Sequence, residues 1–323
     1  MELNNFPLVS IIIPIYNAEP FLQDTLECAI NQVYKKIELI LIDDHSTDKS
    51  WSIAYKYQSL HSNIILKRNK GKGAAAARNY GFQLSKGEFI QYLDADDVIS
   101  PEKIASQIDF IKQNEITSRA LIGCYWQRFS NSIDYKIGPI NPCLNKLSYS
   151  EEEWLLSRTE MPPITWLVHR TLISETSGWN ESLTRNDDGD FFYRIISKTD
   201  QVVIIPKVLS FYRNHNLPSL SKSGNQAHLY SWYISALTYK NIVTEKYGIK
   251  GREASDKFFY YLYFKMLLRD ENIAQLCKKE LYNKKANHEI GDRFVQKLSY
   301  YISLKNAKRI RFMINRLRGL PPF

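Results

Sequence analysis

The sequence contains no cysteine pattern that indicates a metal site or a disulfide framework. Its four cysteines lie at least nineteen residues apart, with no CxxC pair and no histidine at ligand spacing: Cys28, Cys124, Cys143 and Cys277. Reduced thiols of this kind favour the cytoplasm. No window approaches the roughly eighteen apolar residues of a membrane-spanning helix, and residues 8–15 are too short and too β-branched for a signal peptide. We therefore expect a globular cytoplasmic protein.

The end of the chain has no acidic residues, although the net charge of the whole protein is only +9. We call residues 293–318 the basic C-terminal segment because it contains eight cations: Arg293, Lys297, Lys305, Lys308, Arg309, Arg311, Arg316 and Arg318. The nearly neutral remainder argues against an extended basic face and predicts no nucleic-acid partner. Apolar residues interleave with these cations, as in a helix that binds an anionic membrane surface. A helix packed on the body of the protein is the alternative.

Buried strands and amphipathic helices alternate through the first 115 residues. β-Branched or continuous apolar runs predict strands, and helical spacing of apolar residues separates them. The predicted strands are residues 8–15, 37–42, 63–67 and 89–93. This alternation predicts an α/β fold with a Rossmann-like, mostly parallel sheet flanked by helices.

Three carboxylates, Asp94, Asp96 and Asp97, follow the last of these strands. Open α/β sheets bind ligands at the carboxyl ends of their strands. If the strand continued, Asp94 and Asp96 would share one face and Asp97 would point the other way. Carboxylates this close need a cation or hydrogen-bond donors, and Mg²⁺ and Mn²⁺ prefer oxygen ligands. Taken alone, the cluster is also compatible with a solvated turn before the next helix.

A glycine-rich stretch, Gly71-Lys72-Gly73, precedes an alanine-rich helix over residues 74–84. It matches neither the dinucleotide fingerprint nor the P-loop, and a flexible surface turn is the alternative. With Arg78 and the N-terminus of the helix, it could receive a diphosphate.

The second half of the chain continues the alternation less regularly. We predict helices over residues 101–113 and 150–156, and strands over residues 120–129, 164–169, 202–205 and 208–212. His169 lies among apolar residues and is interpreted as a structural histidine. Asp187, Asp188 and Asp190 stand where another helix begins; helix capping explains some of these carboxylates, but not all three are needed for it. Residues 225–268 predict two packed helices interrupted near Gly248.

Several ordered motifs together resemble the N-terminal region of family 2 glycosyltransferases. They are VSIIIPIYNAEPFLQDTLECAINQVYKKIELILIDDHSTD, then AAAARNYG, then GEFIQYLDADD. Members of this family are inverting enzymes with a GT-A fold that use nucleotide-diphospho-sugars. The resemblance is close over residues 7–115 and continues loosely to about residue 220. The spacing from Asn69 to Arg78 is longer than the usual pattern of the family.

The resemblance implies a role for particular residues on the donor side. It places four residues around the base and ribose of the nucleotide: Pro14, Tyr16, Asn17 and Asp44. Arg78 is implied to lie near the nucleotide-sugar. Asp94-Ala95-Asp96 is implied to be the DXD motif, with Asp94 a ribose or metal-shell partner and Asp96 a metal ligand.

Two further stretches resemble later motifs of the family. Residues 187–194 are similar to the acceptor-site motif Glu-Asp-x-x-[Leu/Phe]-x-x-Arg, which implies that Asp188 is the catalytic base. Asp187 stands in place of the Glu, and this departure leaves open which of the two is the base. Residues 212–215, Tyr-Arg-x-His, resemble a loop that folds over the diphosphate and the metal. His215 is then a metal or phosphate contact, with an ordinary loop histidine as the alternative.

The hypothesis from sequence is a metal-dependent inverting hexosyltransferase that uses Mg²⁺ or Mn²⁺ and a UDP-sugar. We expect a GT-A domain over residues 1–222, with a nucleotide-sugar half (1–115) and an acceptor half (116–222), and a helical region over 223–323. The resemblance and the basic C-terminal segment suggest an acceptor on a polyprenyl lipid carrier, in O-antigen or capsule synthesis at the inner face of the bacterial cell membrane. A sugar-phosphate nucleotidyltransferase and a non-enzymatic membrane- or nucleic-acid-binding protein are the alternatives.

Overall fold

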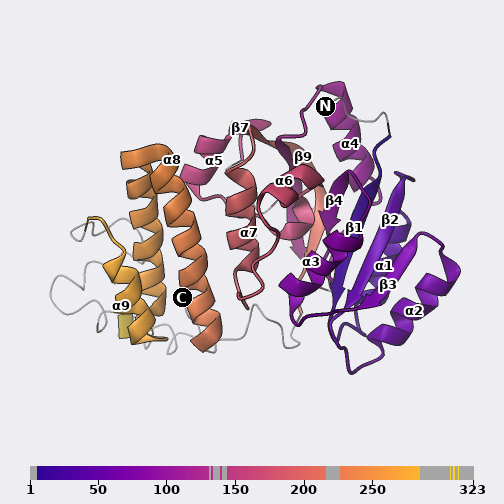
Figure 1. Cartoon of the computed structure of the whole chain (residues 1–323), viewed down its shortest axis with the longest axis horizontal. Helices are drawn as coiled ribbons and strands as arrows, with labels where there is room; N and C mark the ends of the chain where they lie inside the picture. The colour runs from indigo at the N-terminus through magenta and orange to yellow at the C-terminus, as the bar shows by residue number, and fades with distance from the viewer. Residues whose placement is uncertain are drawn as a thin grey trace. The chain divides into compact units, whose positions relative to one another are not determined.

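A computed structural model describes residues 6–130, 132–133, 139, 144–215 and 226–283, together with 306, 308, 309 and 312. The chain divides into two units, Met1–Ser219 and Leu220–Phe323. The first unit combines strands and helices, whereas the described part of the second is helical (Figure 1).

Parallel strands form the centre of the first unit. Their spatial order is β3-β2-β1-β4, and β8 adds an antiparallel strand at the edge beside β4. The strands are β1 (Val9–Ile15), β2 (Ile37–Asp43), β3 (Ile64–Arg68), β4 (Phe89–Tyr92) and β8 (Val168–His169). β1 and β2 are almost entirely buried, because their continuous apolar runs pack on both faces of the sheet. The predicted α/β, GT-A-type architecture is confirmed.

Helices pack against this sheet (Figure 1). They are α1 (Leu22–Ile30), α2 (Ser50–Leu60), α3 (Ala74–Leu84) and α4 (Lys103–Gln113). α3 crosses β1 so closely that a Cβ at Gly81 would lie 2.4 Å from Cγ2 of Ile12. The glycine therefore fixes the depth at which α3, and with it Arg78, lies on the sheet.

A second, smaller sheet contains four strands: β5 (Val98–Ile99), β6 (Ala120–Phe129), β7 (Ser148–Ser150) and β9 (Gln201–Arg213). β9 pairs in parallel with β6 and antiparallel with β5 and β7. The prediction of two strands over residues 202–212 was wrong. Pro206 cannot donate to the ladder, but the register shifts beside Tyr125 of β6 and absorbs it, so one strand continues.

The segment between the sheets also differs from the prediction. Residues 164–169 were expected to form one strand, but only Val168–His169 (β8) pairs with β4. Pro163–Thr165 forms a 3-10 turn (η1), in which the backbone amide of Thr165 donates to the carbonyl of Pro162 at 3.0 Å. The adjacent prolines favour the turn because their φ angles are fixed and they lack amide donors. The remaining helices in the described part of the first unit are α5 (Glu151–Ser157), α6 (Arg170–Glu175) and α7 (Asp187–Ile196).

The second unit is a helical hairpin. α8 (Gln226–Met266) is interrupted at Gly248, which has φ 54°, and α9 (Glu271–Lys279) follows. The predicted interruption is confirmed. Nζ of Lys240 pairs at 2.8 Å with Oε2 of Glu280, just after α9. Among the described residues, no helix is both long and apolar enough to cross a bilayer.

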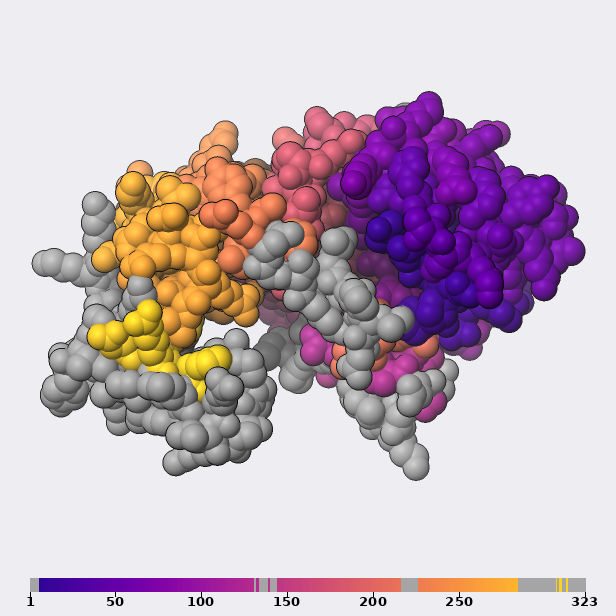
Figure 2. All heavy atoms as spheres, turned by 90° about the horizontal axis from the view of Figure 1, so that it is seen from below, coloured from indigo at the N-terminus to yellow at the C-terminus, as the bar shows by residue number. Residues whose placement is uncertain are grey.

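Most of the basic C-terminal segment lies outside the described residues. Its described positions, 306, 308, 309 and 312, are the yellow spheres in Figure 2. Lys308 is buried, and its ammonium group donates to the carbonyl of Phe264. Burial, with Arg269 and Lys265 nearby, lowers the pKa of Lys308 to about 8. At least this cation therefore packs on the second unit, as in the alternative to the membrane hypothesis.

Candidate active site

The carboxyl ends of β1, β2 and β4 meet at one edge of the main sheet and bring the first group of predicted residues together. Pro14 is near the end of β1. Tyr16 follows with 63% of its surface exposed, and Asn17 has φ 46°. The side-chain oxygen of Asn17 accepts from the backbone amide of Thr47 at 2.8 Å, which joins the loops after β1 and β2. An exposed tyrosine ring beside fixed polar groups can stack on a base.

Asp44 holds the glycine-rich loop. Its Oδ1 accepts from Nδ2 of Asn69 at 2.7 Å, and its Oδ2 accepts from the backbone amide of Gly73 at 2.8 Å. Gly73, with φ 94°, lies immediately before α3. Both oxygens of this carboxylate therefore serve the loop, and a nucleotide contact would use its remaining lone pairs.

The turn after β4 sends its three carboxylates in different directions. β4 ends at Tyr92, and the backbone amide of Asp97 donates to the carbonyl of Asp94 at 3.1 Å. The strand does not continue, so the condition under which Asp94 and Asp96 would share a strand face is not met. The carboxylates still act on one another: the charge of Asp94 raises the pKa of Asp96, and both raise the pKa of Asp97.

Arg78 connects the turn after β4 to the start of α7. Its Nη2 donates to Oδ1 of Asp94 at 2.7 Å, and its Nη1 donates to Oδ2 of Asp187 at 2.9 Å. The guanidinium lies over the ring of Trp179, 4.3 Å from its centroid. Burial alone would lower the pKa of Arg78, but Asp94 and Asp187 raise it above its usual value. Arg78 thus binds two carboxylates that are far apart in sequence.

Asp96 faces His215. The distance between Oδ2 of Asp96 and Nε2 of His215 is 3.0 Å, and the imidazole packs on Phe21 with ring centroids 4.7 Å apart. Burial, and then the charge of Asp94, raise the pKa of Asp96, whereas His215 opposes the rise. A carboxylate held in this environment gains from a cation.

Asp97 has a structural environment. It is 1% exposed, and its Oδ1 accepts from the backbone amide of Arg213 at 2.8 Å. Burial, followed by Asp96 and Asp94, raises the pKa of Asp97 well above its usual range. The guanidinium of Arg213 reaches the carbonyl of Asp96 and the carboxylate of Asp24. The pair of Asp97 and Arg213 therefore fastens the turn to the end of β9.

The side chains of Asp96 and His215 are of chemical types that bind divalent cations. Asp96 supplies a carboxylate and His215 an imidazole, ligands that Mn²⁺ accepts, while Mg²⁺ favours the oxygen. Within the described part of the chain, no group of three or more histidine, cysteine or acidic side chains surrounds one point. Two protein ligands would leave further positions to diphosphate and water oxygens.

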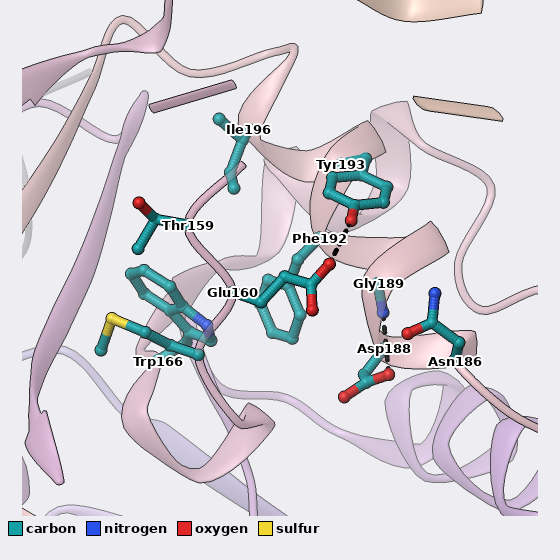
Figure 3. Close-up of a pocket in the computed structure, with 10 residues that line it drawn as sticks. Thr159, Glu160, Trp166, Asn186, Asp188, Gly189, Phe192, Tyr193 and Ile196 are labelled. Atoms are coloured by element: carbon teal, nitrogen blue, oxygen red, sulfur yellow. Dashed lines mark hydrogen bonds between the residues drawn. The ribbon is translucent and has the colours of Figure 1, made fainter. Parts of the chain in front are cut away.

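Asp187 and Asp188 begin α7 but face different partners. Asp187 binds Arg78, whereas Asp188 lines a pocket of about 30 Å³ and accepts from the backbone amide of Gly189 at 2.9 Å (Figure 3). Burial, and then the charge of Asp187, raise the pKa of Asp188 to about 7. A carboxylate with this pKa is suited to general-base catalysis near neutral pH.

Asp190 and Arg194 stabilise α7 through an ion pair within the helix. Asp190 is 1% exposed, and its Oδ2 accepts from Nη2 of Arg194 at 2.7 Å. Nη1 of Arg194 also donates to the carbonyl of Gly178 at 2.7 Å. His169 is buried, and its ring contacts Phe89 edge to face, as expected of a structural histidine.

Two residues at this site were missed from the sequence. Glu160 lines the pocket of Asp188, and Trp179 lies under Arg78. Trp179 occurs in Gly-Trp-Asn just before the acceptor motif, which is a local signal for an aromatic near the site. Glu160 is a single acid before Pro162-Pro163, and nothing in that pattern distinguishes it from a surface residue.

Comparison with known proteins agrees with this geometry. Residues 10–160 match the family described as Glycosyl transferase family 2. This match covers a little less than half of the chain, in its N-terminal part. This confirms the resemblance seen in the motifs.

Relatives extend the match along the chain to different degrees. A glycosyltransferase of Haemophilus influenzae is 44% identical over 120 residues, which are 35% of this chain and 45% of that protein. The chain thus spans less than half of this relative. A glycosyltransferase of Rickettsia typhi is 29% identical over 258 residues, 78% of each chain. A UDP-Glc:alpha-D-GlcNAc-diphosphoundecaprenol beta-1,3-glucosyltransferase of Escherichia coli, WfaP, is 44% identical over 34% of this chain and 43% of its own length.

Solved structures share the fold across nearly the whole chain. S. aureus TarS 1-349 in complex with UDP-GlcNAc has a TM-score of 0.69 at 14% identity, covering 97% of this chain and 92% of that one. The mannosyltransferase PcManGT from Pyrobaculum calidifontis, in complex with GDP-Man and Mn2+, has a TM-score of 0.57 at 15% identity and covers 98% of this chain and 81% of its own. At these identities the likeness shows the GT-A fold.

Proposed function

We propose that the protein is an inverting hexosyltransferase that moves a sugar from a nucleotide-diphospho-sugar to an acceptor hydroxyl. The observation that carries this proposal is the bridge from Asp94 through Arg78 to Asp187. It joins the turn that resembles the donor-binding motif to the helix that resembles the acceptor motif. A donor and an acceptor bound at these two places would meet, as a transfer reaction requires.

On the donor side, Tyr16, Asn17, Pro14 and Asp44 lie at the sheet edge where the nucleotide is expected. We infer a UDP-sugar donor, since the names of the E. coli relative and of TarS specify UDP-sugars. Asp96 and His215 would hold Mg²⁺ or Mn²⁺, and Asp94 would stay beside them on Arg78. Such a cation supplies charge neutralisation at the departing diphosphate.

On the acceptor side, Asp188 acts as the base and Asp187 as its neighbour tied to Arg78. The acceptor oxygen attacks the anomeric carbon on the face opposite the diphosphate. The new carbon–oxygen bond forms as the bond to the diphosphate oxygen breaks, and the hydroxyl proton passes to Asp188. Attack from the opposite face inverts the anomeric configuration.

The acceptor is proposed to be a sugar on a polyprenyl diphosphate carrier, in the synthesis of a bacterial surface polysaccharide such as O-antigen or capsule. The name of WfaP specifies a diphosphoundecaprenol acceptor, and another relative is the minor teichoic acid biosynthesis protein GgaB of Bacillus subtilis. The charge of the basic C-terminal segment supports peripheral binding to the inner face of the cell membrane. Because Lys308 is buried in the second unit, the other cations of the segment would make the membrane contact.

Product analysis tests the proposed function. The protein is incubated with UDP-glucose, UDP-N-acetylglucosamine or GDP-mannose, with Mn²⁺ or with a chelator, and the released nucleotide is identified. We expect metal-dependent release of the nucleoside diphosphate from one donor through slow hydrolysis, and faster release with a lipid-linked sugar. Release of pyrophosphate from a nucleoside triphosphate and a sugar phosphate would identify a nucleotidyltransferase instead.

A further inference from the structure

The pocket beside α7 contains two carboxylates, although the acceptor motif accounts for only one. Glu160 comes from the segment between α5 and η1, and Asp188 comes from the first turn of α7; both line the pocket (Figure 3). Its volume of about 30 Å³ leaves room for a water molecule or a hydroxyl group. A single polar group of an acceptor can therefore enter between the carboxylates.

Neighbouring side chains hold Glu160 in place through one of its oxygens. The hydroxyl of Tyr193 donates to Oε1 of Glu160 at 2.6 Å, and Nη1 of Arg158 donates to the same atom at 3.2 Å. Oε2 accepts no hydrogen bond from the described residues, and the side chain is 41% exposed. Glu160 thus has a fixed carboxylate with one oxygen available to a ligand.

The two carboxylate oxygens of Asp188 also differ in their hydrogen bonding. Its Oδ1 accepts from the backbone amide of Gly189, and its Oδ2 accepts from none of the described residues. The charged groups that act on Asp188 come from three elements: Asp187 on α7 itself, Glu160 after α5, and Arg78 on α3. Burial raises the pKa of Asp188 most, Asp187 and Glu160 raise it further, and Arg78 lowers it. Arg78 is already paired with Asp94 and Asp187, and Arg158 forms an ion pair with Glu160, so Asp188 has no ion-pair partner among the described residues.

We propose that Glu160 is a positioning residue for the transfer reaction, which lines the pocket beside Asp188 and, through its negative charge, stabilises the protonated form of Asp188 when the acceptor hydroxyl gives up its proton. This inference rests on the proposed function. In the reaction the hydroxyl proton moves to Asp188 while the acceptor oxygen bonds to the anomeric carbon. The negative charge of Glu160 favours the proton on Asp188, because a like charge nearby disfavours the carboxylate.

A matched pair of substitutions separates this role from a general loss of surface charge. Glu160→Gln keeps the size of the side chain and removes its charge. Glu175→Gln makes the same change at a glutamate of α6 that is 42% exposed and pairs with Arg119 at 3.3 Å, outside the pocket. Glu160→Asp retains the charge and serves as the conservative variant.

The decisive measurement is the titration of Asp188 in the protein without substrate. The carboxyl resonances of ¹³C-aspartate-labelled protein are followed with pH by NMR, and Asp188→Asn identifies the resonance of Asp188. We expect a midpoint near 7 in the native protein and a decrease of about one pH unit in Glu160→Gln. Glu175→Gln should leave the midpoint unchanged, and Glu160→Asp should retain most of it. An unchanged midpoint in Glu160→Gln overturns the proposal.

The pH dependence of donor consumption provides the second measurement. The rate of consumption of the donor identified above is measured against pH. In Glu160→Gln the acidic limb of this profile should shift to lower pH by as much as the NMR midpoint does, while the KM of the donor stays within about twofold. If the NMR midpoint moves and the rate profile does not, Asp188 is not the base, and the proposed mechanism fails while the carboxylate pair remains. If neither moves, the pair itself is refuted, and the proposed function stands without it.

Discussion

Two carboxylate triplets, one after β4 and one at the start of α7, share two features and differ in the partner of their third acid. In each triplet one acid binds Arg78, namely Asp94 or Asp187. A second acid is 1% exposed and bonds to an arginine: Asp97 accepts from the backbone amide of Arg213, and Asp190 pairs with the guanidinium of Arg194. The third acid faces the proposed reaction.

The partner of this third acid differs between the triplets. Asp96 lies beside His215, whereas Asp188 shares its pocket with Glu160. A histidine can become a fellow ligand of a cation, whereas a second carboxylate favours a proton. Under the proposed function, the same residue type would bind a cation in one triplet and accept a proton in the other.

The largest effect should follow from breaking the link between the triplets. Arg78→Met leaves Asp94 and Asp187 without their cation in a mostly buried site, so we expect a loss of about 3 kcal/mol in unfolding free energy and no measurable transfer. Urea denaturation and donor consumption check this. The control Arg119→Met removes two exposed ion pairs, with Glu175 and Asp200, and should cost less than about 1 kcal/mol. Equal costs for the two variants would show that Arg78 is not a structural link.

Two conservative substitutions can separate the roles of Asp188 and Asp187 in the triplet at the start of α7. Asp188→Asn should lower transfer about a hundredfold or more because the base is lost, while donor affinity remains within a few fold. Asp187→Asn should lower transfer less and reduce stability more, because Asp187 binds Arg78. Steady-state kinetics and calorimetric titration of the donor compare the two. A greater loss of transfer in Asp187→Asn would exchange their roles.

Substitutions in the triplet after β4 should likewise separate the role of Asp96 from that of Asp97. Asp96→Ala should abolish the Mn²⁺-dependent part of donor binding measured by calorimetry, since it removes the proposed ligand. Asp97→Asn should change donor affinity by less than about threefold, because Asn can still accept from the amide of Arg213 and the raised pKa of Asp97 already favours its neutral form. Unchanged metal dependence in Asp96→Ala would remove the metal role.

The smallest effect concerns stability and pH. Burial raises the pKa of Asp188 to about 7. Asp188 therefore lowers the free energy of unfolding most at pH values where it is ionised in both the folded and the unfolded protein. Its contribution should therefore become unfavourable as pH rises from about 4 to 7 and stay constant above that. Asp188→Asn should have a higher Tm than the native protein at pH 8, by about 2–4 °C, and a smaller difference at pH 5. The opposite sign in differential scanning fluorimetry would contradict the raised pKa.

The sequence predicted the main sheet well because β1, β2 and β4 are buried on both faces and so are continuous apolar runs. It failed where a proline or a turn decided the outcome, as at Pro206 in β9 and at Pro163 in η1. The triplets were visible as acids at element ends. Their pairing through Arg78 was not, because a contact between residues 109 positions apart leaves no local pattern.

The bridge through Arg78 also has a consequence for engineering. A chimeric enzyme could be made by keeping residues 1–115, the proposed donor half, and replacing the residues from about 116 onward, the proposed acceptor half. Arg78 belongs to the retained half, whereas Asp187 and Trp179 belong to the exchanged one. A chimera without an acid at position 187 would contain half of a buried ion pair, and its failure would reflect folding rather than specificity. Compatible donor and acceptor halves should therefore be chosen by whether the incoming half brings a carboxylate and an aromatic ring to Arg78.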